Sequence, residues 1–453
     1  MHSVKLTMAK TLFVLFVACG WQMSATAQEN SPYSRYGLGD LRPNHNVFTR
    51  GMGGISAAVA DNNSINFTNP ASLTYIGNTI FDVATEVDYR ILKSQVPAKK
   101  FTSANTYVSY LQLAFPLTTP KMAKKNMLWA MSFGIKPVSN INYKIEESKR
   151  LPGIDSSHTL YEGSGGANQA FFGTGFKYKN LRVGINAGYM FGNKDHSTIR
   201  TIIPDSVNNF HYTSNSATKT AYGGLFINGG IQYDIALARD EKNPLIVTKN
   251  LRLGVYGSLQ QKINAKSDLV RETIFYDQNG NIFRIDSVYQ ENDVKGTIKY
   301  PAMVGIGGVY QDANWLVGAD FELGNWSAYR YYGQKDEVQN NWMARLGAQY
   351  NPFKPGTSAT KYFRHVNYRA GFYYGSDYVN TNANRPEYGF TIGTGMPLTS
   401  IRKRNPYGDY VVLNTALEVG NRGNKQTNLR ENLVRFSIGI SMNASWFQKR
   451  KYY

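Results

Sequence analysis

The stretch from Val434 to Asn443, VRFSIGISMN, alternates strictly between apolar and polar or small side chains. Successive side chains of a β-strand point to opposite faces of the sheet, so this period of two predicts a strand with one apolar face. Its length also suits a tilted strand that crosses a membrane, which needs about 9–11 residues. The stretch therefore fits either a soluble sheet that buries its apolar face or a membrane barrel that turns it toward lipid.

The same alternation recurs along the chain from residue 79 onward. In residues 181–191, for example, leucine, valine and isoleucine alternate with arginine, glycine and asparagine. Together these patterns predict about 14 strands. The candidate strands lie near residues 79–91, 105–116, 127–136, 169–178, 181–191, 221–235, 250–262, 297–310, 313–323, 338–350, 365–375, 387–397, 409–420 and 432–444.

Three features favour a membrane barrel over a soluble sandwich. The polar face is rich in glycine and carries arginine, aspartate or glutamate in most strands. The strands approach the spanning length, and aromatic residues gather near their ends, as the interfacial girdles of outer-membrane barrels require. We therefore predict an all-β fold, a transmembrane antiparallel β-barrel over residues 79–453, located in the outer membrane.

The links between the predicted strands alternate in length. The three longest, 137–168, 192–220 and 263–296, follow odd-numbered strands, whereas links such as Lys179-Asn180 are tight turns. Outer-membrane barrels have long outside loops and short periplasmic turns, so the three long links are expected outside and both termini in the periplasm. The turn-forming sequence at 277–281 predicts a hairpin of its own within the third long link.

The first 27 residues resemble a secretory leader in composition. Lys5 and Lys10 precede an apolar run that is too short to span a membrane, and Ala25-Thr26-Ala27 is a small-residue cleavage site. We predict a signal peptide at residues 1–27, with cleavage before Gln28; a retained membrane anchor is the alternative. The single cysteine of the chain, Cys19, lies in this leader, so no disulfide is expected in the mature protein.

The segment from 28 to 78 differs from the strands that follow. Its centre, residues 51–73, reads GMGGISAAVADNNSINFTNPASL and has no sustained period. Such a segment has little apolar surface of its own to bury and must pack against something larger. We predict that residues 28–78 form a plug, or hatch, in the barrel lumen. The candidate hatch residues are Gly53, Gly54, Asn69, Pro70 and Ala71. The alternative is a simple turn before the first strand, because Pro70 fixes its φ angle in either case.

Charged residues recur on the polar faces of the predicted strands. Both signs occur, which argues against a simple ion-selective pore. They fit either a path for a substrate or ion pairs that hold the plug and line a solvated wall. The lumen-facing candidates are Asp82, Glu86, Asp88, Arg90, Arg182, Arg252, Asp320, Glu322, Arg345, Arg369, Glu418 and Arg435.

Composition and motifs narrow the function classes. The 453-residue chain has a net charge of +19, but its 50 lysines and arginines are spread along the sequence without a recognition helix or zinc-ligand spacing. This pattern favours contact with anionic lipid headgroups over nucleic-acid binding. The six histidines lack metal-ligand spacing, and no nucleophile elbow or phosphate loop occurs. We therefore expect no enzyme activity, metal or cofactor.

Several short motifs resemble the FadL/TodX family of outer-membrane transport proteins (OMPP1/FadL/TodX). Asn69-Pro70-Ala71 is similar to the family's hatch, residues 301–326 to its mid-barrel strand pair, and 368–374 to its late-barrel signature. The ending Ser445-Trp446-Phe447 resembles barrels of Bacteroidota-type bacteria. The resemblance implies a fourteen-stranded barrel with an N-terminal plug that passes fatty acids or aromatic hydrocarbons. Members of the family also act as shuttle or scaffold barrels in type IX secretion.

Two functions follow as expectations. The first is an outer-membrane channel for hydrophobic small molecules, gated by the plug; the second is a non-transporting scaffold or shuttle barrel in type IX-type secretion or outer-membrane assembly. A purely structural barrel is a third. An apolar cavity between plug and wall would favour the channel, and a lumen filled with polar side chains would favour the scaffold. The expected partners are outer-membrane lipid or lipopolysaccharide, a hydrophobic ligand, and secretion or assembly proteins, with no nucleic acid.

Overall fold

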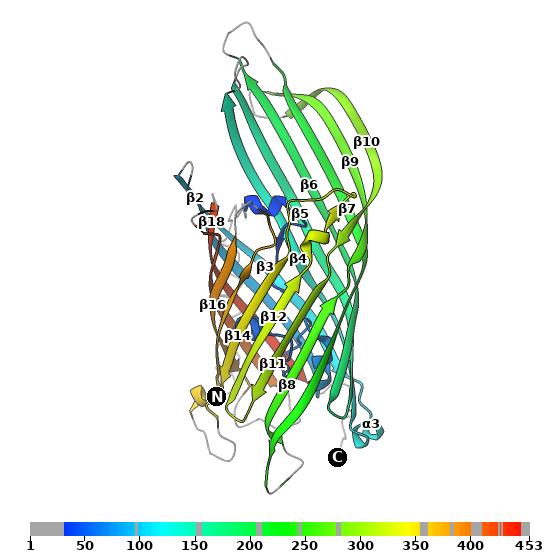
Figure 1. Ribbon diagram of the computed structural model, residues 1–453, viewed down its shortest axis with the longest axis vertical. Helices are drawn as coiled ribbons and strands as arrows, with labels where there is room; N and C mark the ends of the chain where they lie inside the picture. Colours follow the sequence, from blue (N-terminus) through cyan, green and yellow to red (C-terminus); the bar gives the residue numbers. More distant parts are fainter. Residues whose placement is uncertain are drawn as a thin grey trace, which may run out of the picture.

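The chain closes into an antiparallel β-barrel of 14 strands, which confirms the predicted fold (Figure 1). A computed structural model describes residues 31–453 except 96–97, 151–155, 205–210, 242, 244–246, 278–281, 354–360, 381–384, 400–409, 425, 427–428 and 445–453. The predicted signal peptide and the C-terminal motif lie outside the described residues. Within them, the helices are all too short or too polar to cross a membrane.

Sixteen elements build the 14 barrel strands, because two of the strands are interrupted. β8 continues as β9 after a break of two residues, and β10 continues as β11 across Pro301-Ala302. The elements are β2 (Thr79–Gln95), β3 (Ala98–Pro116), β4 (Met127–Arg150), β5 (Ser156–Tyr178), β6 (Leu181–Ile203), β7 (Thr213–Arg239), β8 (Val247–Ser258), β9 (Gln261–Tyr276), β10 (Ile282–Tyr300), β11 (Met303–Gln311), β12 (Trp315–Gly324), β14 (Asn341–Tyr350), β15 (Asn367–Ser376), β16 (Pro386–Pro397), β17 (Tyr410–Arg422) and β18 (Leu429–Ala444).

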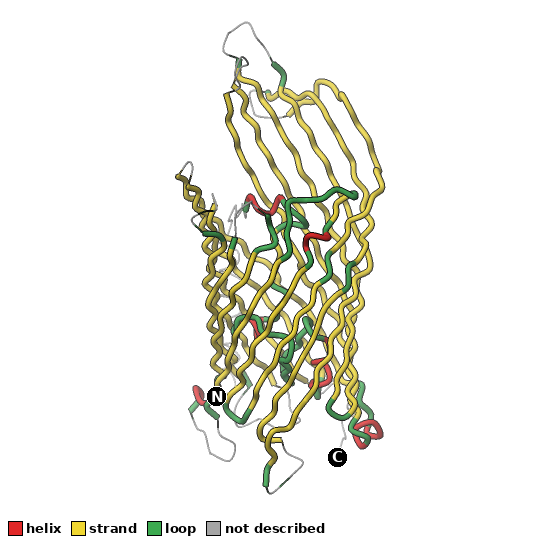
Figure 2. Tube along the Cα trace, in the orientation of Figure 1, coloured by secondary structure: helices red, strands yellow, loops and turns green. Residues whose placement is uncertain are grey.

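The remaining elements are short. They are η1 (Pro32–Arg35), β1 (Asp40–Leu41), α2 (Val47–Arg50), η2 (Pro70–Tyr75), α3 (Pro120–Lys124), η3 (Trp326–Ala328), β13 (Arg330–Tyr331) and η4 (Tyr362–His365). Four of them, η1, β1, α2 and η2, belong to residues 31–78, which run inside the barrel and are called the N-terminal segment below (Figure 2).

The barrel closes where β18 pairs with β2, and the two faces of β18 separate as its alternation predicts. Phe436 is 42% exposed on the outside, whereas its neighbour Ser437 is fully buried toward the lumen. Aromatic pairs mark both ends of the apolar band. Trp315 stacks on Tyr350 at one end, and Trp342 lies against Tyr374 at the other. These positions fit the aromatic girdles of a barrel that spans an outer membrane.

The three long links predicted as loops are instead mostly strand. β4 with β5, β6 with β7, and β9 with β10 extend far beyond the apolar band as paired hairpins. They form a six-stranded sheet, here called the wall, that rises above one side of the barrel (Figures 1 and 2). Apart from the hairpin around residues 277–281, the sequence did not predict the wall, because both of its faces are largely polar and no alternation marks it. The predicted turn at 278–281 lies outside the described residues, although the strands on either side of it do pair.

The first described residue, Ser31, shows where the N-terminal segment enters the barrel, whereas the predicted mature N-terminus at Gln28 lies outside the described residues. The Ser31 hydroxyl donates to Glu431 Oε1, 2.7 Å away, near the start of β18. Ala444, the last residue of β18, pairs with Thr79 at the opposite end of the barrel. Ser31 therefore lies at the end that carries the wall. The N-terminal segment descends through the lumen from there and joins β2 at the other end.

Candidate functional site: the occupied lumen

Glycines on the inner faces of the strands let the N-terminal segment lie directly against the barrel backbone. A Cβ atom on Gly175 would come within 2.8 Å of the Pro70 carbonyl oxygen, and one on Gly184 would overlap the Pro70-Ala71 peptide. Gly254 faces Ala57 in the same way. The glycine-rich polar face noted in the sequence thus provides close backbone approach.

Asn69, Pro70 and Ala71 form a buried helical cap. Asn69 Oδ1 accepts from the Ala71 amide at 3.1 Å and begins η2, with proline at the first position, where no amide donor is needed. Asn69 Nδ2 donates to the Ala57 carbonyl oxygen at 2.6 Å. The other two candidates, Gly53 and Gly54, adopt φ angles of +69° and +83°, which favour glycine, and the Gly53 amide donates to Thr391 Oγ1.

A cluster of buried ion pairs joins the N-terminal segment to β2, β17 and β18. Arg42 Nη1 lies 2.8 Å from Asp88 Oδ2, and Arg50 pairs with Glu86. Arg435 of β18 connects β2 with β17, because its Nε lies 2.6 Å from Asp88 Oδ1 and its Nη1 lies 3.1 Å from Glu418 Oε2. All of these side chains are less than a tenth exposed. Buried charges of this kind are paired because an isolated one carries a large desolvation penalty.

A second set of pairs ties β1 to the wall end of the lumen. Asp40 receives Arg90 Nη2 at 2.5 Å and Arg422 Nη1 at 2.8 Å. Arg422 also reaches Glu387, and a further buried pair joins Arg385 to Asp377 beside it. Three barrel strands, β2, β16 and β17, therefore share one charge network with the N-terminal segment.

A third cluster holds the other end of the N-terminal segment. Asp234 accepts from Arg182 Nε and Arg252 Nε, each at 2.8 Å. The Tyr75 ring lies against both guanidinium groups, 3.5 Å from Arg182 Cζ and 4.2 Å from Arg252 Cζ, and its hydroxyl donates to Asp234 Oδ1. Arg182 also donates to Thr74 Oγ1 at 2.6 Å. The segment is thus fixed just before it enters β2.

The remaining lumen candidates contact the N-terminal segment, each other or polar side chains of neighbouring strands. Asp320 Oδ2 accepts from the Ser56 and Ala57 amides at 2.5 and 2.7 Å. Arg345 pairs with Glu322 at 3.3 Å. Asp82 accepts from Ser441 and Gln112, and Arg369 lies over the Phe48 ring while donating to Gln349 and Asn414.

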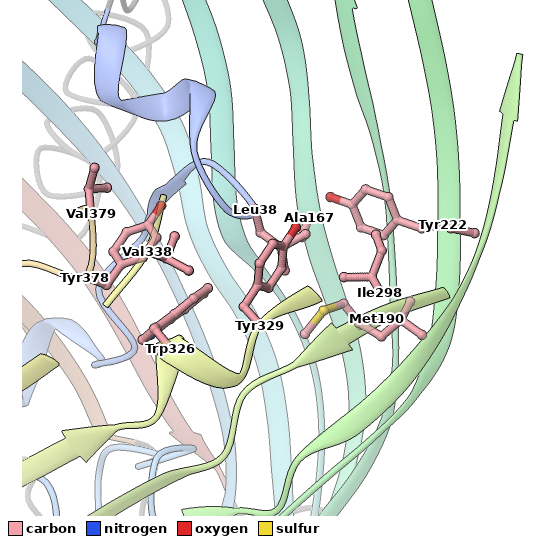
Figure 3. Close-up of a cluster of buried hydrophobic side chains, with 12 residues drawn as sticks. Leu38, Ala167, Met190, Tyr222, Ile298, Trp326, Tyr329, Val338, Tyr378 and Val379 are labelled. Atoms are coloured by element: carbon pink, nitrogen blue, oxygen red, sulfur yellow. The ribbon is translucent and has the colours of Figure 1, made fainter. Parts of the chain in front are cut away.

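An apolar cap closes the lumen at the wall end. The link between β12 and β14 folds inward, and Trp326, Tyr329 and Val338 converge on Leu38 of the N-terminal segment (Figure 3). Tyr378 stacks against Trp326 with ring centroids 4.4 Å apart, and its hydroxyl donates to the Tyr36 carbonyl oxygen. The cap is thus built from segments far apart in sequence.

A cavity of about 220 Å³ remains between the cap, the N-terminal segment and the barrel. Its lining includes Arg42, His45, Lys136, Trp326, Arg345 and Tyr378. The four acidic residues that line it, Glu322, Asp377, Glu387 and Glu418, are each paired with an arginine. Apolar and aromatic side chains such as Val138 and Phe226 also line the cavity, which therefore combines paired charges with apolar surface.

The cavity borders a seam in the barrel. β3 pairs with β4 only from Leu111↔Ile135 to Pro116↔Ala130, and beyond that point β3 pairs with β2 alone. The N-terminal segment takes the place of β3 beside β4 there, because β1 pairs with Ser139 and Asn140 of β4. The Arg42 amide then donates to the Val138 carbonyl oxygen at 2.9 Å. The inner side of the seam is covered by this pairing.

The sequence predicted some of the barrel partners in these networks, such as Asp88 and Arg435, but it missed others, such as Asp234 and Arg422, and all of the partners in the N-terminal segment. The sequence analysis did not predict roles for Asp40, Arg42, Arg50 and Tyr75, because the plug prediction rested on the glycine- and asparagine-rich centre of the segment. The charges of Asp40, Arg42 and Arg50 were the available signal, because a charge in a buried segment requires a partner. Among the described residues, His, Cys, Asp and Glu form no cluster that could hold a metal ion.

Comparisons with known proteins assign the chain to a family. A family model described as BamG matches residues 8–453. The chain belongs to the BamG family. A comparison with curated protein sequences finds no match.

Solved structures similar to this BamG-family chain are hydrocarbon channels and a FadL homologue. The Pseudomonas putida toluene transporter TodX is 15% identical, with a TM-score of 0.52 over 90% of this chain and 100% of that one. The CymD monoaromatic hydrocarbon channel is 14% identical, with a TM-score of 0.52 over 91% and 100%. A Pseudomonas aeruginosa FadL homologue is 12% identical, with a TM-score of 0.53 over 90% and 100%. At these identities the likeness shows a shared fold, that of the FadL/TodX barrel.

Proposed function

We propose that this BamG-family protein is a permanently plugged outer-membrane barrel that serves as a scaffold for outer-membrane assembly or protein secretion. The observation that carries the proposal is the buried ion-pair network between the N-terminal segment and the barrel. Arg42, Arg50 and Asp40 of the segment are each held by at least one buried partner of opposite charge. The N-terminal segment then acts as a fixed plug and not as a gate.

The energetics favour a plug that stays in place. Removing one partner of a buried ion pair typically costs about 3–5 kcal/mol, because the other charge is left uncompensated in a medium of low dielectric constant. Withdrawal of the plug would break three such clusters and the apolar cap together. A channel that opens frequently would instead need a weakly held gate, because mobile elements come from the less stable parts of a structure.

The wall supports the scaffold proposal independently. It adds a large sheet beyond the membrane without enclosing the lumen further, and two of its edges are only partly paired. β10 pairs on its far side only at Ile298 and Lys299, with β13, and β4 pairs beyond the seam only at Ser139 and Asn140, with β1. Open strand edges are surfaces that other chains can recognise. A partner protein docked there would need no passage through the lumen.

The test measures both the influx of a hydrocarbon and the effect of the protein on the amounts of other outer-membrane proteins. Vesicles prepared from outer membranes with and without the protein are supplied with a radiolabelled monoaromatic hydrocarbon, and the initial influx rates are measured. The proposal expects equal rates, and it expects depletion of the protein to lower the amounts of other outer-membrane proteins. Faster influx through the wild-type protein, with normal levels of other outer-membrane proteins after depletion, would contradict it.

The seam favours a second candidate, a channel for hydrophobic small molecules. It adjoins the cavity, whose lining includes apolar side chains, and a solute that entered the cavity could leave sideways into the membrane without moving the plug. The fold shared with the CymD and TodX channels supports this reading. A bulky Val138→Trp substitution beside the seam should then slow hydrocarbon influx, whereas the scaffold proposal expects no change.

A further inference from the structure

The outer surface changes character where the wall leaves the apolar band. Leu225 and Leu259 are 74% and 83% exposed on the outside of β7 and just after β8. Gln261 bonds both the amide and the carbonyl of Ile227, which holds the start of β9 beside these side chains. The next outward residue of β9 is Lys262, so a cationic side chain lies directly at the rim of the apolar band.

Lys262 belongs to a row of three cations on neighbouring strands. It lies opposite Lys299 of β10, and Lys299 lies opposite Arg330 of β13. All three point outward, because the adjoining Ile263, Ile298 and Tyr331 pack inward in the cap cluster. Strands are spaced about 4.8 Å apart, so the row spans roughly 10 Å. A second outward pair, Lys266 opposite Lys295, stands one step further from the membrane.

The row carries an energetic cost in the protein alone. Like charges directly opposite each other on a sheet are destabilising. Among the described residues, Lys262 and Lys299 form no ion pair, and Arg330 Nη1 donates only to the Ser327 and Tyr329 carbonyl oxygens. The second pair has acidic neighbours, because Lys266 Nζ lies 2.5 Å from Asp293 and also interacts with Asp268. Three cations that repel one another at the rim of a lipid-facing band indicate that an anionic ligand binds there.

We propose that Lys262, Lys299 and Arg330 bind the phosphate groups of lipopolysaccharide in the outer leaflet. The long hairpins place this end of the barrel outside, where the lipopolysaccharide headgroups lie. The acyl chains can pack on Leu225 and Leu259 while the phosphates bind the cationic row, so one lipopolysaccharide molecule can contact both surfaces. Guanidinium and ammonium groups are the side chains that bind phosphate. The site would anchor the wall to the membrane surface, whichever function the lumen has.

The experiment measures binding of purified lipid A to the full-length protein in detergent. Three probes are used: bisphosphorylated lipid A, dephosphorylated lipid A and inorganic phosphate. The triple variant Lys262→Gln/Lys299→Gln/Arg330→Gln is compared with a control in which Lys121→Gln and Lys124→Gln change exposed lysines of α3, at the opposite end of the barrel. Each basic residue near an anionic lipid surface contributes about a factor of five in affinity.

The triple variant should therefore bind bisphosphorylated lipid A on the order of 100-fold more weakly, while the control variant binds like the wild type. Its thermal midpoint without lipid should be unchanged or higher, because the substitutions remove like-charge repulsion. Equal binding of dephosphorylated lipid A, full competition by millimolar inorganic phosphate, or unchanged affinity of a folded triple variant would each overturn the proposal.

Discussion

Arg435→Met tests the buried ion-pair network at the residue of β18 that connects Asp88 of β2 with Glu418 of β17. Arg435 is 4% exposed and contacts Asp88 at 2.6 Å and Glu418 at 3.1 Å. Asp88 keeps Arg42 and Arg90 after the substitution, whereas Glu418 keeps, among the described residues, only the hydroxyl of Tyr373. The loss should therefore come mainly from an uncompensated Glu418 carboxylate, at about 3–5 kcal/mol.

The free energy of unfolding is measured by denaturant titration in detergent, with heat-modifiable gel mobility reporting the folded barrel. The double variant Arg435→Met/Glu418→Gln should recover much of the loss, because it removes the orphaned charge as well. The half-exposed pair of Lys144 with Glu162 provides a control, and Lys144→Met should cost less than about 1 kcal/mol. A loss below about 1 kcal/mol for Arg435→Met, or no recovery in the double variant, would refute the reasoning.

Three further tests concern the membrane face, the plug contact and a turn. Ile438→Arg should cost roughly 2–4 kcal/mol near the bilayer midplane, and Met442→Arg near the strand end about 0–1 kcal/mol; equal denaturation midpoints would show that the face or depth is wrong. Gly184→Ala should destabilise the barrel by about 1–3 kcal/mol, since its Cβ meets the plug backbone, whereas Gly77→Ala, which has open space, should not; the paired melting curves decide. Hydrogen bonds from the amides of the turn between β11 and β12 lower the pKa of Asp312, so its stabilising effect should be present at pH 7 and lost as the pH falls below about 4. A midpoint difference between wild type and Asp312→Ala that does not shrink at all as the pH is lowered from 7 to 2 would contradict this assignment.

The sequence predicted the strands and their faces because the period of two is a local property. Ile438 and Ser437 point to opposite faces whatever the strand pairs with. The wall was mistaken for loops since residues such as 213–220 carry hydroxyl and lysine side chains on both faces and show no apolar alternation. The partners in the ion pairs could not be predicted from the sequence for a different reason. Asp88 and Arg435 are 347 positions apart, and their contact depends on the register in which the barrel closes.

The most direct test of a fixed plug is to tether it. A Cβ atom on Gly439 of β18 would lie 3.4 Å from the Val47 Cβ atom of the plug, close to the separation of bridged cysteines. The double variant Val47→Cys/Gly439→Cys should therefore form a disulfide, which non-reducing gels can quantify. In cells depleted of the wild-type protein, we expect the fully bridged variant to restore growth and outer-membrane composition as well as each single variant does. Loss of function in the bridged form that is reversed by a reductant would show that the plug moves, and would contradict the account.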